Sequence, residues 1–346
     1  AQCPVMARDP ADLHGDTGVF DAHSDLLYAV SREHDLGNED VISDRFLEDM
    51  RDGGIDMRVT PIFLDAAEAR EPATRRGLGL AEVFHREVES TDALESATTA
   101  ADVRAGVDSD AVTLLLGMEG AEPLSGDLAV LDAFHRLGLR VLGLTHSRRN
   151  RAADGSFYEP TRSGTPGGLS AFGVATLERC NELGIVVDVS HLNEPGFWDI
   201  VEFADEPFVA SHSNCRARCD HPRNLTDDQL RAVADSGGVV GVNALQLFLD
   251  GDDPDRSTVV EHVRHAVDVA GIDHVGFGFD FYDYNLQYLS PVVAERKIDV
   301  SAATGLAGDA DVANLTAALL ADGFDPVEVR KLLKLNFVRV FEAVLD

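Results

Sequence analysis

Eight short β-rich runs alternate with helical patterns along this chain, and this alternation constrains the fold more than any other feature. The runs cover residues 18–25, 56–64, 111–119, 140–146, 185–191, 208–212, 238–245 and 274–280. Strands that alternate with helices favour a parallel sheet, because each crossover returns the chain to the same end of the sheet. Eight such units predict an α/β protein with a closed (β/α)8 barrel of the TIM type.

Helix signals support this interpretation. A predicted helix over 169–184 ends at a glycine, which is a common C-terminal stop. A second predicted helix over 226–237 begins at a threonine followed by Asp-Asp-Gln, which is typical of an N-terminal cap. Residues 326–344 carry apolar side chains at helical spacing, and we expect this last helix to close the barrel wall.

The length fits a single domain. The chain has 346 residues, and barrels of this type commonly exceed about 250 residues as one unit. We find no low-complexity segment or internal repeat, and therefore predict one catalytic barrel domain over 1–346. Two long loops, 148–168 and 281–313, are candidates for lids or binding loops.

The charge balance is strongly acidic. Asp and Glu number 61 against 29 Lys and Arg, for a net charge of -32. Phosphate contacts are therefore disfavoured, and no nucleic-acid partner is expected. A surface of this charge repels itself unless salt screens it, so the composition predicts a halophilic protein.

Other features bear on the compartment. The four cysteines are too few for a disulfide framework in so long a chain. No apolar run approaches the roughly 20 residues that span a membrane, and the first residues lack the pattern of a signal peptide. We therefore expect a cytoplasmic protein without a membrane partner.

The run "VFDAHSDLL" ends in closely spaced polar residues. On an extended strand, side chains at i and i+2 point to the same face, so His23 and Asp25 can aim at one point. Asp21 could orient His23 from behind, as ligating histidines usually require. The competing interpretation is a helix cap formed by Ser24 or Asp25.

Other predicted strands also end in potential ligands. These residues are Glu119, His146, His191, His212 and Asp280. Period two places Glu119 with Leu115, and His191 with residues 185, 187 and 189, on faces that should point into the barrel. Asp188 falls on the opposite face and is interpreted as structural. One such histidine is commonly a core residue, but ligand types on six strands are hard to explain by packing.

These residue types suit a divalent metal. Three imidazoles and several carboxylates favour zinc or a similar ion. Two metals need a bridging ligand, and a carbamylated lysine is excluded at the central strands because no lysine precedes Lys297. Glu119 is the carboxylate placed at a middle strand end. Motifs of serine hydrolases, phosphate-binding loops and dinucleotide-binding loops are absent.

At this point the sequence resembles the renal (membrane) dipeptidase family of binuclear zinc peptidases, with a metallo-dependent hydrolase-like barrel. The matching segments, in the order of the family, are "FDAHSDLL", "GMEGAEPL", "LGLTHSRRNRAADG", "GLSAFG", "VDVSHL", "ASHSNCRA", "HPRNLTDDQL" and "HVGFGFDF". The resemblance spans about residues 18–345. The chain departs from the family at Phe279, at Tyr282–Asp283 and at Lys334–Leu335.

The resemblance implies two Zn²⁺ ions per subunit and a role for each residue. The ligands would be His23 and Asp25 for one zinc, and His191 and His212 for the other, with Glu119 bridging both. His146 would stabilise the developing oxyanion beside the substrate carbonyl. Arg223 would bind the substrate carboxylate, although its local sequence fits a surface arginine equally well. Asp280 would transfer a proton to the leaving nitrogen or hold the substrate amino group.

We therefore predict a zinc-dependent dipeptidase that hydrolyses dipeptides by means of a metal-bridging hydroxide. One alternative is another binuclear-metal amidohydrolase, such as a cyclic-amide or lactone hydrolase or a deaminase. Those enzymes usually begin with His-x-His, whereas this chain has His-x-Asp. A second alternative is an inactive homologue that binds metal and peptide. The resemblance also suggests a homodimer.

Overall fold

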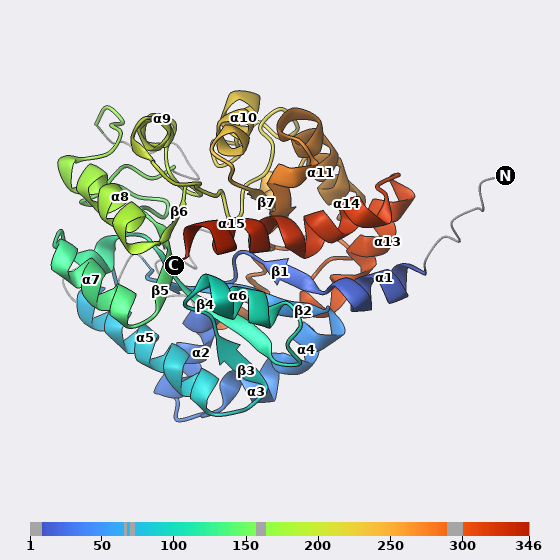
Figure 1. Cartoon of the computed structure of the whole chain (residues 1–346), viewed down its shortest axis with the longest axis horizontal. Helices are drawn as coiled ribbons and strands as arrows, with labels where there is room; N and C mark the ends of the chain where they lie inside the picture. Colours follow the sequence, from blue (N-terminus) through green and yellow to red (C-terminus); the bar gives the residue numbers. More distant parts are fainter. Residues whose placement is uncertain (1–8, 66–67, 70–72, 157–163, 289–299, 346) are drawn as a thin grey trace.

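The computed structural model describes residues 9–65, 68–69, 73–156, 164–288 and 300–345. Parts of both predicted long loops, 157–163 and 289–299, lie outside the described residues. The rest forms a sheet surrounded by helices (Figure 1).

The strands pair in parallel and close into a barrel, which confirms the predicted fold class. Neighbours in the sheet follow the order β6-β5-β4-β2-β1-β8-β7. Val209 and Ala210 fill the remaining gap, because Val209 bridges to Asp188 of β6 and Ala210 bridges to Val240 of β7. The strands are β1 (Val19–Asp21), β2 (Ile55–Phe63), β3 (Leu94–Ser96), β4 (Val112–Glu119), β5 (Leu139–Gly143), β6 (Val186–Asp188), β7 (Val240–Val242) and β8 (Val275–Phe277).

Among the strands that the structure describes, the sequence pattern failed to predict β3. It pairs with the first half of β4, whose second half pairs with β5 at residues 116–119. Thus β3 extends the sheet at the amino end of β4. It is not one of the eight barrel segments, which are the seven strands in the order given above and the segment at Val209–Ala210. Its three residues are too few to show a period of two.

Alternate residues of most barrel strands pack into two separate apolar clusters. The barrel interior holds side chains such as Phe20, Met57, Leu115, Val141 and Val186. Their immediate neighbours along the strands face outward, into the layer between sheet and helices. This alternation is the pattern expected for a barrel whose interior is filled by side chains.

The helices form the outer layer. The described α-helices are α1 (Pro10–Thr17), α2 (Leu26–Asp35), α3 (Val41–Arg45), α4 (Leu47–Asp52), α5 (Ala73–Glu89), α6 (Ala100–Gly106), α7 (Leu128–Arg136), α8 (Ala171–Leu183), α9 (Glu194–Phe203), α10 (Asp227–Asp235), α11 (Arg256–Ala270), α13 (Ala313–Ala321), α14 (Pro326–Arg330) and α15 (Asn336–Val344). Short 3₁₀ turns include η4 (Asp283–Tyr288) and η5 (Asp309–Asp311).

The two predicted internal helices begin and end as their signals indicate. Ser170 caps α8, and Gly184 follows it in the left-handed conformation that glycine adopts without strain. Thr226 caps α10 in a capping box with Gln229. These local signals could be recognised because each acts within a few residues.

The predicted C-terminal helix differs in two respects. It is interrupted by a π-helical turn, η6 (Lys331–Leu335), between α14 and α15. Helix α15 also belongs to the interior cluster and not to the outer wall: Phe337 and Phe341 lie 5.5 and 5.0 Å from the Phe20 ring. It therefore covers the barrel interior (Figure 1).

Lys334 explains one departure from the family pattern. Its buried ammonium donates to the Asp56 carboxylate at 2.5 Å and to the carbonyls of Thr17 and Val107. All three donors of the ammonium therefore have acceptors. The lysine ties the π-helical turn to β2 and to the ends of α1 and α6.

Candidate active site

The predicted site residues meet at the carboxyl ends of the parallel strands. Glu119 is the last residue of β4, and the other ligand types follow their strands by two to four residues. In a parallel barrel, all carboxyl ends lie on one side, where active sites are built. The structure brings together His23, Asp25, Glu119, His146, His191, His212 and Asp280.

Glu119 lies between two groups of potential ligands. Its Oε1 atom is 3.0 Å from His191 Nε2 and 3.4 Å from His212 Nε2. On the other side, His23 Nε2 lies 3.7 Å from the same oxygen, 3.8 Å from Asp25 Oδ1 and 3.9 Å from Asp280 Oδ1. One carboxylate between two clusters is the arrangement that a shared ligand of two cations requires.

Unsatisfied oxygens supply an independent test of fit for a metal. Both Glu119 oxygens and Asp25 Oδ1 are buried and accept no hydrogen bond from the described residues. Buried carboxylates without partners are costly, and pairing with a cation removes that cost. Asp25 occupies the N-cap position of α2 yet makes no capping hydrogen bond. The helix-cap interpretation therefore fails for Asp25, and the donor set fits a divalent metal.

The electrostatics of the site agree with this fit. Burial raises the pKa of Asp25 to about 7. Burial, followed by the charge of Asp25, raises the pKa values of Glu119 and Asp280 well above their usual range. Burial, followed by the charge of Arg223, lowers the pKa of His23 to about 3. The site thus combines neutral imidazoles with carboxylates whose mutual repulsion a cation would relieve.

The strand period fails near His191. Val187 and Val189 pack in the outer layer, so the prediction that His191 shares an inward face with them is wrong. His191 reaches the site because its backbone adopts a left-handed conformation, with φ of 65°. Such a conformation is rare outside glycine and is concentrated at functional positions. Asp280 has a similar φ, 58°.

Asp188 is therefore also placed differently from the prediction. It occupies the inward face of β6, opposite to Val187, and its carboxylate lies close to ring nitrogens of His23 and His212. Its oxygens accept hydrogen bonds from Ser190 and Ser211. The alternation of side chains along β6 was the signal that could have found it. With Val187 assigned to the outer face, Asp188 falls on the inward face, next to the site.

His23 and Asp25 converge by a route that a strand does not provide. Strand β1 ends at Asp21, and α2 begins at Leu26, so the two side chains are oriented by the intervening turn. Asp21 accepts from the backbone N–H groups of His23 and Phe279 and from Arg58 Nε. Asp21 therefore holds the backbone of His23. The sequence had suggested that it orients the imidazole ring instead.

Arg223 is buried beside the site, which excludes the surface interpretation. Its Nη1 donates to Ser213 Oγ at 2.7 Å, and its Nη2 donates to the His212 carbonyl at 2.8 Å. Its Nε is buried and has no hydrogen-bond partner among the described residues. The guanidinium is thus fixed in orientation and retains donors for a ligand.

His146 lies at the edge of the same cluster. Its ring centroid is 4.3 Å from that of His191 and 4.9 Å from that of Phe63. Ser147 Oγ lies 3.0 Å from its Nδ1. Burial, followed by the charge of Arg148, lowers its pKa well below the usual value. A neutral imidazole at this place can donate a hydrogen bond to a substrate oxygen.

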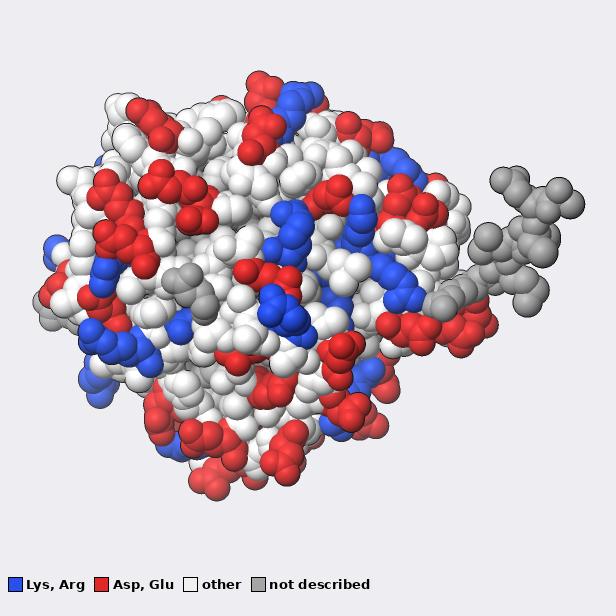
Figure 2. Space-filling model, in the orientation of Figure 1, with Lys and Arg blue, Asp and Glu red and all other residues white. Residues whose placement is uncertain are grey.

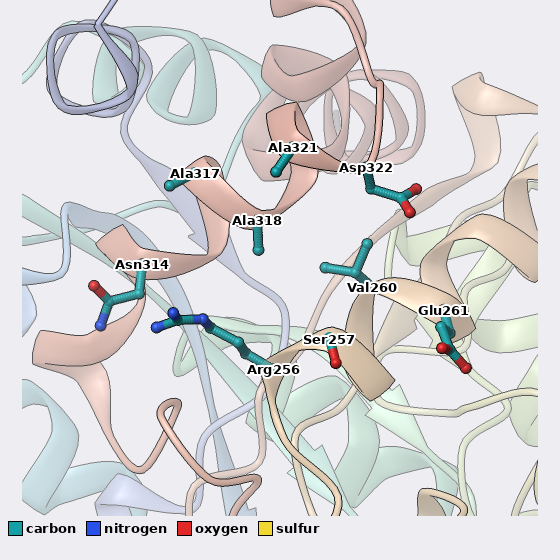
Figure 3. Close-up of a pocket in the computed structure, with 9 residues that line it drawn as sticks. All are labelled: Arg256, Ser257, Val260, Glu261, Asn314, Ala317, Ala318, Ala321 and Asp322. Carbon is teal, nitrogen blue, oxygen red and sulfur yellow. The ribbon is translucent and has the colours of Figure 1, made fainter.

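A surface groove of about 490 Å³ lies elsewhere, between α11 and α13 (Figure 3). Arg256, Glu261 and Asp322 line it together with three alanines of α13. None of the predicted site residues contributes to it, so it is separate from the strand-end cluster. Within the part of the chain that the structure describes, the helices are too short or too polar to cross a bilayer.

Comparison with known proteins identifies the family. The family model described as membrane dipeptidase (peptidase family M19) matches residues 8–346. An uncharacterised protein from the pqqA 5′ region of Klebsiella pneumoniae is 36% identical over 263 residues, which are 74% of this chain and 90% of that protein. Dipeptidase verJ of Clonostachys rogersoniana is 29% identical over 280 residues, covering 80% of this chain and 67% of that protein.

Two solved structures share the fold over nearly their full length. The dipeptidase AC, a family M19 metallopeptidase, superposes with a TM-score of 0.84 at 31% identity, over 95% of this chain and 99% of its own. A metallopeptidase of Rhodobacter sphaeroides, bound to a phosphinate mimic of the dipeptide L-Ala-D-Ala, gives a TM-score of 0.81 at 30% identity, over 94% and 99%. The chain belongs to the membrane dipeptidase family, peptidase family M19.

Proposed function

We propose that this protein is a dipeptidase that holds two zinc ions at the carboxyl end of its barrel. The observation that carries the proposal is Glu119, which lies between two ligand clusters and whose two buried oxygens accept no hydrogen bond from the described residues. His23 and Asp25 would hold one ion, and His191 and His212 the other. Zinc, when bound, supplies Lewis acidity and an activated water for attack on a carbonyl group.

The residues around this centre have complementary roles. His146, at the edge of the cluster, would donate a hydrogen bond to the oxygen on which negative charge develops, which is commonly a large catalytic contribution. Asp280 faces His23 across the site. Its raised pKa suits a group that accepts a proton and passes it to the departing nitrogen.

The substrate class follows from Arg223 and from the family. A fixed guanidinium whose Nε has no hydrogen-bond partner among the described residues suits a carboxylate, which a dipeptide presents one residue from its scissile bond. The metallopeptidase of Rhodobacter sphaeroides binds a dipeptide mimic, which supports the same class here. We propose short free peptides, with dipeptides preferred, as substrates.

The test combines metal quantification with a hydrolysis screen. Purified protein is dialysed, loaded with zinc, and assayed against L,L and L,D dipeptides, cyclic amides and lactones. We expect about two zinc ions per chain and turnover of dipeptides. Turnover of cyclic amides alone would favour another amidohydrolase, and tight peptide binding without turnover would favour an inactive homologue.

We further propose that the protein works in a salt-rich cytoplasm. Acidic side chains are spread over the face seen in Figure 2, and the net charge is -32. Raising KCl from 0.1 to 2 M shortens the screening length from about 10 Å to under about 3 Å. The melting temperature should therefore rise across this range, and a flat or falling curve would refute the salt adaptation. The suggested dimer stays a prediction, which sedimentation can test.

A further inference from the structure

We infer that Asp188, acting through Ser211, fixes the ring orientation and tautomer of His212. The inference rests on the proposed metal centre, in which His212 is a ligand. Asp188 and Ser211 are positioning residues, because neither is assigned a contact with substrate. The observation behind the inference is a continuous chain of hydrogen bonds from a buried carboxylate to the imidazole ring.

The direction of these hydrogen bonds can be worked out. Ser211 Oγ lies 2.5 Å from Asp188 Oδ2 and 2.7 Å from His212 Nδ1. A carboxylate only accepts, so the single hydroxyl proton of Ser211 is donated to Asp188. The hydroxyl oxygen is then left to accept from His212, which places the imidazole proton on Nδ1. The Nε2 lone pair consequently points into the ligand cluster, 2.9 Å from His191 Nε2 and 3.4 Å from Glu119 Oε1, where a metal would bind.

The Asp188 carboxylate is held from three sides. Its Oδ1 accepts from the backbone N–H of Ser190 at 2.9 Å and of Ser211 at 2.8 Å, while Oδ2 accepts from the Ser211 hydroxyl. In contrast, Asp25 Oδ1 and the Glu119 oxygens have no hydrogen-bond partner among the described residues. Proximity alone would allow Asp188 to be a ligand, but its occupied lone pairs favour action through Ser211.

The backbone that carries the ring is fixed independently. A Cβ atom added at Gly241 of β7, or at Gly278 directly after β8, would collide with the Ser211 carbonyl oxygen, so both segments approach this backbone too closely for side chains. Arg223 donates to the His212 carbonyl at 2.8 Å. With the main chain held in this way, the remaining freedom of His212 is rotation of its ring. The stacked His23 ring, 3.7 Å away, restricts tilting, and the Ser211 hydroxyl fixes which way Nδ1 points.

Two substitutions interrupt the chain differently. Ser211→Ala removes the acceptor of the Nδ1 proton and leaves the carboxylate in place. Asp188→Asn keeps the volume but reverses the polarity: the two backbone N–H groups hold Oδ1, so the amide NH₂ must face Ser211. Its donation to Oγ directs the hydroxyl proton at His212 Nδ1, which favours the tautomer with Nε2 protonated. Because both changes act through one chain, the double variant should be little worse than Asp188→Asn.

The experiment measures metal affinity without using activity. Zinc is titrated against a chromogenic chelator, and the Co²⁺-loaded proteins are compared by their visible spectra. We expect Ser211→Ala and Asp188→Asn to lower the affinity for one of the two zinc ions by about 10- to 100-fold and to change the Co²⁺ spectrum. Ser211→Thr keeps the hydroxyl and should restore the affinity. Ser190→Ala is the matched control, because that hydroxyl accepts from the His212 backbone N–H and not from the ring.

The outcomes separate the inference from the proposed function. If the wild type binds no metal, both are overturned. If it binds two ions and Ser211→Ala binds them equally well, the inference fails and the metal centre stands. Loss of metal in Asp188→Asn but not in Ser211→Ala would make Asp188 a direct ligand and overturn the inference that it acts through Ser211. If Ser211→Ala does not fold, Asp188→Asn, which keeps the buried volume nearly unchanged, still tests the inference, and unchanged affinity for both ions in that variant would overturn it.

Discussion

Arg223→Lys tests how the site recognises its substrate. A guanidinium has five N–H donors, and described residues use two of them, Nη1 to Ser213 and Nη2 to the His212 carbonyl. Three donors therefore remain, which is enough for a bidentate contact with a carboxylate. A charge-assisted hydrogen bond contributes about 1.5–3 kcal/mol, and lysine can keep at most one of the two, so the substitution should cost about 1.5–3 kcal/mol. That free energy corresponds to a loss of about 10- to 150-fold in kcat/KM.

The assay compares a dipeptide with the same dipeptide carrying a C-terminal amide. In the wild type, removal of the substrate carboxylate should lower kcat/KM by at least the factor expected for Arg223→Lys. In the variant, the two substrates should differ by clearly less than in the wild type, because the bidentate contact with the carboxylate is gone. Lysine keeps the positive charge but cannot form the planar bidentate contact.

Metal content must be measured in parallel, because Arg223 also holds the His212 carbonyl. The comparison is valid when the variant retains as much zinc as the wild type. Equal losses of kcat/KM for the dipeptide and its amide in Arg223→Lys would refute the assignment. In that case Arg223 would act on the metal centre through His212 and not on the substrate.

Three further predictions concern the metal, the proton and the core. Glu119→Ala should lose both zinc ions and all hydrolysis together, which elemental analysis and a dipeptide assay would check; retention of two ions would exclude a bridging role. Asp280→Asn should keep its zinc and lower kcat by about 10²- to 10⁴-fold, whereas an unchanged kcat would remove Asp280 from the mechanism. Phe337→Ala should lower the free energy of unfolding by about 3–5 kcal/mol in a denaturant titration, because its ring is buried against Phe20. The half-exposed Leu335 supplies the control, and a similar loss in Leu335→Ala would contradict a specific role for the Phe337 contact.

The parts of the fold that could be predicted depend on local chemistry. Eight β-rich runs indicated the barrel, and the caps at Ser170 and Thr226 lie where α8 and α10 begin. The π-helical turn at Lys331–Leu335 could not be predicted, because the buried Lys334 finds its carboxylate, Asp56, on a distant strand. A helical period in the sequence contains no information about such a partner.

The site shows a similar division, and the reason is geometric. The types of the ligands and the strands they follow were readable, because parallel strands must all end on one side of the barrel. Their directions were not, because most of them lie after the strand, where a period of two no longer applies. His191 and Asp280 depend on left-handed turns, and Asp25 depends on the start of α2. The alternation of side chains does apply to Asp188, because this residue still belongs to β6. A residue within a strand is thus oriented by the sheet, whereas a ligand beyond its end is oriented by a turn whose conformation the sequence period does not encode.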